Sequence, residues 1–342
     1  MKAIFLKKFG ASQEAFEIME TELPVPGPTE LIIKVESFGL NFADVMARKG
    51  LYKQTPNLPT ILGFDIAGIV HAVGREVKDL SIGQKVAAMT RFGGYAEYAK
   101  TSANAVIPIP EGMNFNTASA LTTQGAAAYY CTSYIARLRE GDHILVHAAA
   151  GGLGNLIVQI AKRKGCIIFG TASSSKLEML KENGVDYPID YRKVDFENEI
   201  RKILPNRGLD IVYDNIGGKS FGKGFRLLDT GGKIISYGVA SRNSGKKPSK
   251  FGILKIIRGF GYYSPITLLR NSKSIIGVNL LRLGDHKPEL IQYCLREFVK
   301  LVENETVIPR IDKVYKVQQI ADAHDYLEAR LSTGKIAVVW KN

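Results

Sequence analysis

The 342-residue chain contains only three cysteines, Cys131, Cys166 and Cys294, which lie far apart in the sequence. An odd, widely spaced set argues against a disulfide framework and against a cysteine-based zinc site. No apolar run approaches the roughly 18 residues of a membrane span. The apolar stretch at 3–6 lies between lysines and is too short for the core of a signal peptide. A cytoplasmic location is therefore expected.

Acidic residues are absent from one long stretch of the chain. Residues 231–283 contain no Asp or Glu but ten Lys and Arg, which supply most of the formal charge of +13. Basic surfaces attract nucleic acids, anionic membranes or phosphorylated ligands, and a solvated lysine-rich surface is the alternative interpretation. The stretch contains no nucleic-acid-binding motif, so no nucleic-acid partner is expected.

The hydrophobic pattern divides the chain into two parts. The first 120 residues read as short strands broken by prolines, which indicates a compact β-barrel-like domain. A helix is expected at 117–136, after which apolar strands alternate with helical segments, the pattern of parallel βαβ units in an α/β fold. The tail predicts helices at 286–304 and 317–329 and a last strand at 335–340. The strands expected in the α/β part are 144–148, 167–171, 210–213, 233–237 and 274–278.

The most informative segment is a glycine-rich turn. An apolar strand at 144–147 leads into small residues, and a helix with an apolar face follows. Without bulky side chains, a dinucleotide pyrophosphate can approach the backbone N–H groups at the helix N-terminus. The spacing of Ala148, Gly151 and Gly154 is related to the three-glycine fingerprint, although such turns also occur without ligands. The residues expected to bind the pyrophosphate are Ala150, Gly151, Gly152, Leu153 and Gly154.

This segment, continued through Gln159 and Lys162, resembles the signature of the zinc-independent quinone oxidoreductases (zeta-crystallin-like) within the medium-chain dehydrogenase/reductase superfamily. The resemblance covers essentially the whole chain. It implies a GroES-like β-barrel catalytic domain formed by residues 1–121 and 280–342, with a Rossmann domain of doubly wound parallel sheet, residues 122–279, inserted between them. The run at 273–280 and the basic insert at about 245–272 resemble the vesicle-amine-transport-protein-like branch.

The residues after the second strand of the nucleotide-binding unit favour NADPH over NADH. NAD-binding units carry an acid there for the ribose diol, whereas this chain has Ser173, Ser174 and Lys176, which can donate to a 2′-phosphate. A serine-rich helix N-cap beside a surface lysine is the alternative. Tyr191, with Arg192, matches family positions at the adenosine phosphate. The resemblance also places at the cofactor Asn215, Tyr237, Gly238, Val278 and Asn279.

The ligands of the catalytic zinc found in related alcohol dehydrogenases are missing. Cys is absent from 39–44, Phe64-Asp65 stands where His-Glu is expected, and 91–95 joins two strands without a four-cysteine lobe. Zinc needs three or four correctly spaced ligands, so no metal is expected. Without a Lewis acid, hydride donation to an electrophilic acceptor needs less help than alcohol oxidation. The five histidines share no ligand spacing and are interpreted as structural.

Two side chains are candidate donors to the enolate oxygen that develops on the acceptor, Asn41 and Tyr52. Asn41 lies in a segment that resembles the family's turn at the substrate and nicotinamide, and Asp44 is expected to order this turn. The tyrosine matching Tyr52 is the proton donor in related enoyl-thioester reductases, with aromatic packing on the barrel as the alternative. Ala127 stands where the family usually has Thr near the nicotinamide, which is expected to rearrange or weaken the site.

The leading hypothesis is an NADPH-dependent, zinc-free reductase of quinones or α,β-unsaturated carbonyls. The alternatives are an enoyl-thioester reductase and a nucleotide-binding peripheral membrane or RNA-binding protein with little catalysis. The family commonly dimerises through the last Rossmann strand, here 274–278, so a homodimer is expected. Residues 246–273 are interpreted as two short helices, joined at 259–264, that cap the cleft over the nicotinamide. An anchor in an anionic membrane is the competing interpretation.

Overall fold

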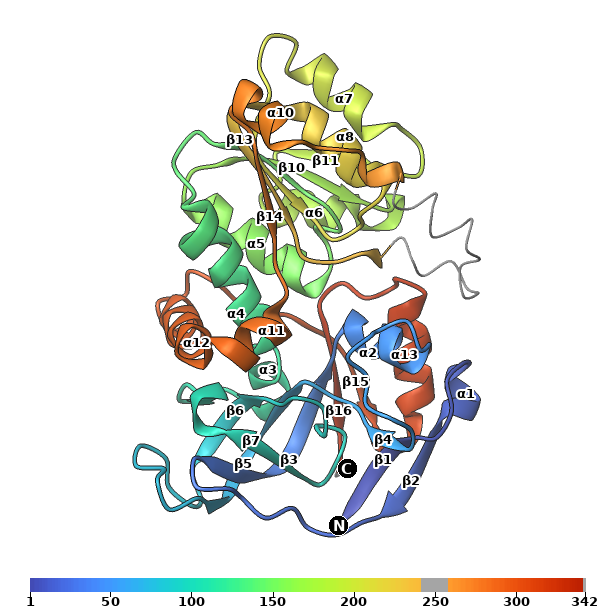
Figure 1. The fold of residues 1–342 in the computed structure, drawn as a ribbon, viewed down its shortest axis with the longest axis vertical. Helices are drawn as coiled ribbons and strands as arrows, with labels where there is room; N and C mark the ends of the chain where they lie inside the picture. The colour runs from blue at the N-terminus through green and yellow to red at the C-terminus, as the bar shows by residue number, and fades with distance from the viewer. Residues whose placement is uncertain (241–257, 341–342) are drawn as a thin grey trace. The chain divides into compact units, whose positions relative to one another are not determined.

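The computed structural model describes residues 1–240 and 258–340. The chain forms two compact units, which we describe separately (Figure 1). Residues 1–127 and 280–342 form the barrel unit, and residues 128–279 form the parallel-sheet unit. The chain therefore contributes its first and last parts to one unit and its middle to the other. None of the helices in the described part of the chain is long and apolar enough to span a membrane.

The barrel unit is built on a seven-stranded sheet in the order β15-β16-β3-β5-β6-β8, with β7 paired to β3, and a three-stranded sheet β2-β1-β4. Strand β16 is antiparallel to β3, and β3 is antiparallel to β5. The inward side chains form one apolar core that includes Ile33, Phe38 and Val338. The strands are β1 (Lys2–Leu6), β2 (Phe16–Glu20), β3 (Glu30–Leu40), β4 (Thr60–Ile61), β5 (Asp65–Val73), β6 (Lys85–Met89), β7 (Tyr98–Ser102), β8 (Val106–Pro108), β15 (Ile311–Lys316) and β16 (Lys335–Val339).

Helices connect the strands of the barrel unit, and the sequence patterns predicted the two longest, near the end of the chain. The expected helices at 286–304 and 317–329 correspond to α12 (Pro288–Glu303) and to η5 (Val317–Gln319) with α13 (Ile320–Glu328). The other helices are α1 (Ser12–Ala15), α2 (Phe42–Arg48), η1 (Ala103–Ala105), α3 (Phe115–Ala118), α4 (Thr123–Tyr129) and α11 (Leu280–His286). The single helix expected at 117–136 is thus divided into α3, α4 and a π-helical segment, η2 (Tyr130–Ala136).

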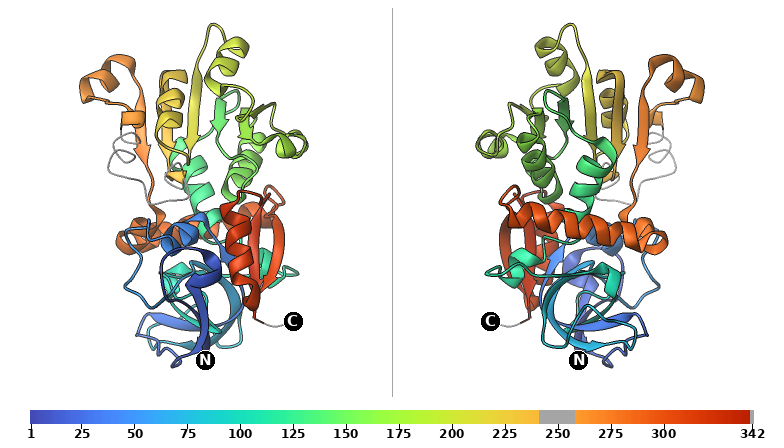
Figure 2. Two further views of the ribbon diagram at one scale, coloured as in Figure 1. Left: turned by 90° about the vertical axis from the view of Figure 1, so that its right-hand side faces the viewer. Right: turned by 90° about the vertical axis from the view of Figure 1, so that its left-hand side faces the viewer.

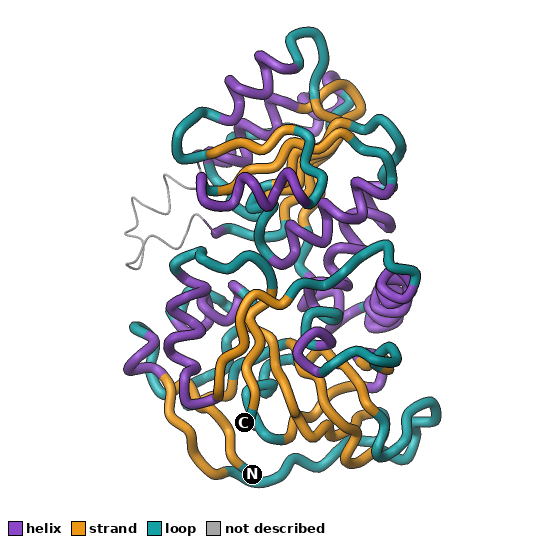
Figure 3. Tube along the Cα trace, turned by 180° about the vertical axis from the view of Figure 1, so that it is seen from behind, coloured by secondary structure: helices purple, strands orange, loops and turns teal. Residues whose placement is uncertain are grey.

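The parallel-sheet unit has six strands in the order β11-β10-β9-β12-β13-β14, all parallel, with helices on both faces (Figures 2 and 3). The apolar residues of β9 are fully buried, as expected for a strand covered on both faces. The strands are β9 (His143–Val146), β10 (Ile167–Ala172), β11 (Tyr187–Asp190), β12 (Leu209–Asp214), β13 (Leu228–Ser236) and β14 (Ser274–Gly277). The helices are α5 (Gly152–Arg163), η3 (Ser174–Lys176), α6 (Leu177–Glu182), α7 (Phe196–Ile203), α8 (Lys219–Leu227) and α10 (Pro265–Asn271).

The basic insert is only partly described. The first of its two expected helices lies largely outside the described residues. Residues 258–260, where the description resumes, are helical. The second expected helix is α10, which begins with the Ser264 hydroxyl accepting the Thr267 N–H at 3.1 Å. A proline at the first turn also favours a helix start there. The cap function proposed for this insert therefore stays a prediction.

Candidate functional site

Three neighbouring strands of the barrel sheet bring Asn41, Asp65 and Lys335 together. In the register of the sheet, Gly39 of β3 pairs with Asp65 of β5 on one side and with Ala337 of β16 on the other. Asn41 follows β3 directly, and Lys335 is the first residue of β16. The three side chains are almost completely excluded from solvent, with exposed fractions of 8%, 0% and 1% respectively. The sequence patterns identified Asn41 but not its two partners.

These side chains form a closed polar network. Asn41 donates from Nδ2 to Asp65 Oδ2 at 2.6 Å, and Lys335 Nζ donates to Asn41 Oδ1 at 2.9 Å and forms an ion pair with Asp65. The other carboxylate oxygen of Asp65 accepts from Thr122 Oγ1 at 2.5 Å and from the Thr123 N–H at 2.7 Å. Burial alone would raise the pKa of Asp65, but Lys335 and the hydrogen bonds from Thr122 and Thr123 hold it below its usual value. Asp65 is therefore an ionised, fully paired carboxylate.

Asp44 occupies a different environment in the first turn of α2. Its Oδ2 accepts the backbone N–H of Asn41 at 2.8 Å, and its Oδ1 accepts that of Gly63 at 3.2 Å. Burial outweighs these hydrogen bonds and raises the pKa of Asp44 to about 7. The side chain thus connects the turn at 39–44 to residue 63. Among residues 1–240 and 258–340, no cation forms an ion pair with Asp44, although the charge of Lys335 lowers its pKa against the effect of burial.

Tyr52 lies beyond α2 and packs against two aromatic rings. The ring centroids are 6.2 Å from Phe64 and 6.4 Å from Phe92, both nearly edge-on. Phe92 has a φ of 65°, which is rare for a bulky residue. Burial, and then the charge of Asp44, raise the pKa of the Tyr52 hydroxyl. Tyr52 therefore has both the aromatic packing of the alternative interpretation and a protonated hydroxyl, which a proton donor requires.

Ala127 lies one turn after Thr123 in α4. Ala127 is 7% exposed and has no hydroxyl. The Thr122 hydroxyl is bonded to Asp65, whereas the Thr123 Oγ1 atom is buried without a hydrogen-bond partner among the described residues. Because residues four apart lie on one face of a helix, Thr123 places a hydroxyl on the face that carries Ala127.

The residues expected to hold the cofactor all follow the carboxyl ends of parallel strands. Such ends meet at one edge of a sheet. The residues at 147–154 follow β9, those at 173–176 follow β10, and those at 278–279 follow β14. In the strand order, β9 lies between β10 and β12, so the chain leaves β9 toward one side and returns on the other. A reversal of this kind is where open α/β sheets bind their ligands.

The loop between β9 and α5 fits a pyrophosphate group. Ala148 has a positive φ of 50°, and its carbonyl accepts the Gly151 N–H at 2.9 Å. Gly151, the N-cap of α5, provides no side-chain cap, so the first N–H groups of the helix are left for an anion. A Cβ at Gly154 would lie 2.3 Å from the Ala148 oxygen, so only glycine fits there.

The serine-rich segment after β10 has an acidic neighbour that the sequence did not indicate. Strand pairing places Ala172 beside Asp190, and the Ser174 hydroxyl donates to the Asp190 carboxylate. That bond, with the Arg192 N–H at 3.0 Å, holds the pKa of Asp190 below its usual value. The proton of Ser174 is therefore directed at the Asp190 carboxylate and not toward a bound phosphate.

The remaining expected cofactor residues lie at the same edge of the sheet. Asn215 Oδ1 and the Tyr237 hydroxyl are buried without a hydrogen-bond partner among the described residues. A Cβ on Gly238 would lie 3.0 Å from the Asn215 carbonyl oxygen, and the Val278 N–H donates to Ser236 at 2.8 Å. Buried polar atoms without partners are rare, so Asn215 Oδ1 and the Tyr237 hydroxyl are candidates for contact with a bound ligand. Two further expected residues, Asn279 and Tyr191, are exposed.

The two buried histidines have internal partners. His147 Nδ1 lies 3.0 Å from Thr171 Oγ1 and its Nε2 lies 3.2 Å from Ser220 Oγ, and burial lowers its pKa to about 4. His324 Nε2 lies 3.2 Å from the Tyr95 hydroxyl, and burial lowers its pKa as well. Within 1–240 and 258–340, no three His, Cys, Asp or Glu side chains converge as metal ligands do. The donor set at Asp65 does not fit zinc, because Lys335 already neutralises it.

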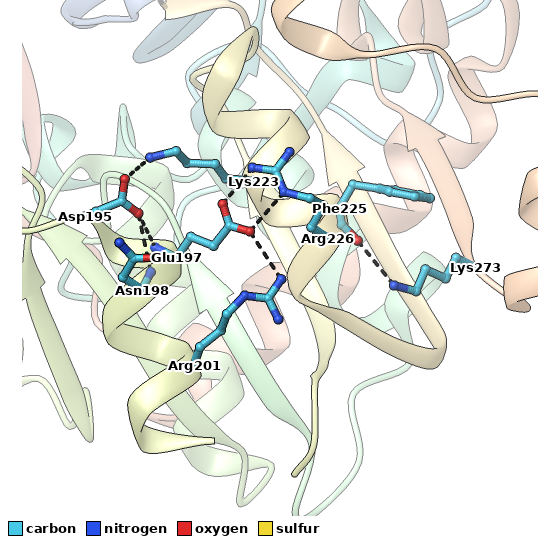
Figure 4. Close-up of polar contacts among 8 residues, drawn as sticks. All are labelled: Asp195, Glu197, Asn198, Arg201, Lys223, Phe225, Arg226 and Lys273. Atoms are coloured by element: carbon cyan, nitrogen blue, oxygen red, sulfur yellow. Dashed lines mark hydrogen bonds and ion pairs between the residues drawn. The ribbon is translucent and has the colours of Figure 1, made fainter. Parts of the chain in front are cut away.

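Several cations of the parallel-sheet unit have structural partners (Figure 4). Glu197 accepts from Arg226 at 2.6 and 2.9 Å and from Arg201 at 3.2 Å, which joins α7 to α8. Lys273, from the acid-free stretch, donates to the Phe225 carbonyl at 3.5 Å and lies 5.5 Å from the Phe225 ring centroid. Burial lowers the pKa of Lys273. This lysine therefore stabilises the end of α8.

Two family models match the chain, one in each half of the sequence. Residues 27–111 match the model of the alcohol dehydrogenase GroES-like domain, and residues 183–338 match that of the zinc-binding dehydrogenase. The synaptic vesicle membrane protein VAT-1 homolog of Danio rerio is 37% identical over 337 residues, 98% of this chain and 69% of the relative.

Three solved structures share the fold over nearly the whole chain. The human synaptic vesicle membrane protein VAT-1 homolog-like protein superposes with a TM-score of 0.86 at 30% identity, covering 100% of this chain and 98% of the other. The CurK enoyl reductase gives 0.85 at 26%, covering 99% and 98%. The Escherichia coli quinone oxidoreductase complexed with NADPH gives 0.84 at 25%, covering 99% and 100%.

These comparisons correct one expectation. The cytoplasmic location inferred from the lack of a long apolar run is contradicted by relatives named synaptic vesicle membrane proteins in Danio rerio, Mus musculus and Tetronarce californica. The inference failed because a protein can associate with a membrane through its surface, and hydropathy detects only spanning segments.

Proposed function

Because the chain belongs to the medium-chain dehydrogenase/reductase family, with the quinone oxidoreductases and the VAT-1 branch, we propose that it is an NADPH-dependent reductase of quinones or α,β-unsaturated carbonyls. The observation that carries the proposal is the loop at 148–154. It combines a glycine that no other residue can replace with a helix N-terminus left uncapped by any side chain. When bound, NADPH supplies the hydride.

The cofactor is held, in this proposal, by the carboxyl edge of the parallel sheet. The first N–H groups of α5 bind the pyrophosphate, and Ser173 and Lys176 bind the 2′-phosphate. Asn215 and Tyr237 offer buried polar atoms that lack partners in the described part of the chain, which suits the carboxamide of a nicotinamide. Val278 and Asn279 complete this edge after β14.

The acceptor oxygen receives its hydrogen bond from the barrel unit. Tyr52 keeps its proton at neutral pH, as a phenol does, and its raised pKa strengthens this, so it acts as a hydrogen-bond donor and a proton source. Asn41 uses one amide hydrogen for Asp65 and has a second one for the acceptor. No metal takes part in the proposal, since the Asp65 carboxylate is neutralised by Lys335.

The second candidate activity is the reduction of an enoyl thioester. It is favoured by the position of Tyr52 and by the likeness to the CurK enoyl reductase. The two candidates differ in the acceptor and share the cofactor and the donor. We also propose that the protein forms a homodimer through β14 and contacts membranes peripherally through the segment around α10.

The test is the oxidation of NADPH by the purified protein with 1,4-naphthoquinone, a simple enone and a crotonyl thioester. We expect turnover with one of the first two, and turnover with the thioester alone would favour the second candidate. Tyr52→Phe should lower kcat and kcat/KM together by about 10²-fold or more. Tyr98→Phe, a change in the same unit where the ring lies against His71, is the matched control. Absence of turnover with all three acceptors would refute the proposal.

A further inference from the structure

We propose that Lys335 is a positioning residue that sets the orientation of the Asn41 side-chain amide. The inference rests on the proposed function, because it assigns to Asn41 a donor role toward the acceptor. Lys335 lies in the last strand of the sheet and is 1% exposed. A buried ammonium is costly unless it is paired, so its retention requires the partners found here.

The chemistry of the partners determines which way the amide faces. An ammonium group has only donors, and an ionised carboxylate has only acceptors. Lys335 Nζ, 2.9 Å from Asn41, therefore selects the amide oxygen, and Asp65 Oδ2, 2.6 Å away, selects the amide nitrogen. The reversed amide would face a donor with a donor and an acceptor with an acceptor. One hydrogen of the Asn41 amide nitrogen is bonded to Asp65, and this fixes the direction in which the second hydrogen points.

The surrounding residues hold this arrangement from both sides. Thr122 Oγ1 and the Thr123 N–H bind the far oxygen of Asp65, so the carboxylate cannot rotate away. On the other side, a Cβ at Gly39 would lie 2.3 Å from Lys335 Cε, so the lysine chain passes over a glycine. The strand register that places Gly39 between β16 and β5 therefore leaves the space that Lys335 fills.

A neutral double variant separates positioning from stability. Lys335→Met alone leaves the buried Asp65 carboxylate without a counter-ion, so this variant is expected to have a much lower Tm. Adding Asp65→Asn removes the uncompensated charge and should recover most of that loss. In the double variant the new amide group keeps its oxygen toward Thr122 and Thr123 and presents its NH₂ to Asn41. The Asn41 amide then turns its oxygen to this group, and its orientation is reversed.

We expect the double variant to have a Tm close to that of the wild type, an unchanged KM for NADPH within about twofold, and a kcat at least about tenfold lower. Lys49→Met is the matched control, since Lys49 also pairs with a carboxylate, that of Glu328, in the same unit. It should keep the wild-type kcat. A double variant that folds and turns over at the wild-type rate would overturn the inference.

A second readout does not depend on turnover. The side-chain amide hydrogens of Asn41 should be protected from solvent exchange in the wild type and lose protection in the double variant, as followed by NMR of ¹⁵N-asparagine-labelled protein. If the wild type reduces no acceptor, the proposed function fails while this measurement still decides the role of Lys335. Equal exchange rates in the wild type and the double variant would refute the positioning role of Lys335.

Discussion

At the scale of single residues, two buried carboxylates of the barrel unit differ in their ionisation because Lys335 forms its ion pair with Asp65 and not with Asp44. Asp65 is paired with Lys335, and its pKa is lowered. Asp44 accepts two backbone N–H groups, and burial raises its pKa to about 7. The folded state therefore binds the Asp44 proton more tightly than the unfolded chain does. This contribution to stability is complete below the ordinary carboxyl pKa and is lost as pH rises through about 7.

We predict that Asp44→Asn removes this pH dependence. Between pH 5 and pH 8, the free energy of unfolding of the wild type should fall relative to that of the variant by roughly 2 kcal/mol. Urea unfolding of both proteins at the two pH values measures the difference. Asp214, whose pKa burial also raises, to about 6, is present in both proteins and cancels. A constant difference across this range would show that Asp44 is ionised in the folded state.

Lys176 and Ser174 both lie in η3, next to the proposed site of the 2′-phosphate. The Ser174 hydroxyl donates to Asp190, so it contributes little to a bound phosphate. Lys176→Ala should therefore weaken NADPH binding about tenfold or more and leave NADH binding unchanged. Ser174→Ala is the control and should have a smaller effect. Titration of each variant with both cofactors measures this, and an equal loss for NADPH and NADH would contradict the phosphate assignment.

At the scale of elements, β14 is an edge strand of the parallel sheet. The Val278 N–H is bonded to Ser236 of β13, so by alternation the N–H of Gly277, one residue earlier, faces outward. An unpaired edge is a template for a second strand. We predict that Gly277→Pro, which removes this donor, shifts the protein from dimer toward monomer.

Gly277→Ala is the matched control for this prediction. It keeps the N–H, and a Cβ there meets nothing within 4 Å. Light scattering at micromolar concentration measures the mass of each protein. A wild-type protein that is already monomeric, or a proline variant as dimeric as the wild type, would contradict dimerisation through β14.

The strands and long helices could be predicted because their patterns are local. The apolar runs of β9 and β10 and the periodic face of α12 are legible within one segment. Lys335 could not be identified in this way, because its partners lie 270 and 294 residues earlier and a lysine beginning an apolar strand reads as an exposed end. Asp190 was missed for the same reason, since only strand pairing brings it to Ser174. Short helices such as α2 depend on tertiary packing, which a sequence pattern does not contain.

At the scale of the whole molecule, the net charge of +13 is concentrated in the acid-free stretch, which also carries exposed apolar side chains. Tyr262, Ile266 and Leu269 have exposed fractions of 91%, 69% and 79%. Apolar side chains beside cations suit the surface of an anionic membrane. We predict salt-sensitive binding to vesicles that contain phosphatidylserine, and none to vesicles of phosphatidylcholine alone.

The double variant Ile266→Asn/Leu269→Asn tests this prediction. It should weaken vesicle binding at least about tenfold without altering the turnover of soluble acceptors. Ile82→Asn/Ile308→Asn is the matched control, since these isoleucines of the barrel unit are 67% and 68% exposed and lie outside the acid-free stretch. Co-sedimentation with vesicles at two salt concentrations measures binding. Equal weakening by both double variants would show that α10 has no special role.

The contribution of both early and late parts of the chain to the barrel unit has a consequence for biosynthesis. A ribosome completes residues 128–279 as one continuous piece, and domains generally fold as units during synthesis. The barrel unit must wait, because β16 enters the sheet beside β3 only after residues 335–339 have been made. Until then Asp65 lacks its counter-ion, which is translated 270 residues later. Under the proposed function, the nascent protein therefore acquires its cofactor-binding unit before the network that positions Asn41 is in place, and hydride transfer requires that residue 335 has been made.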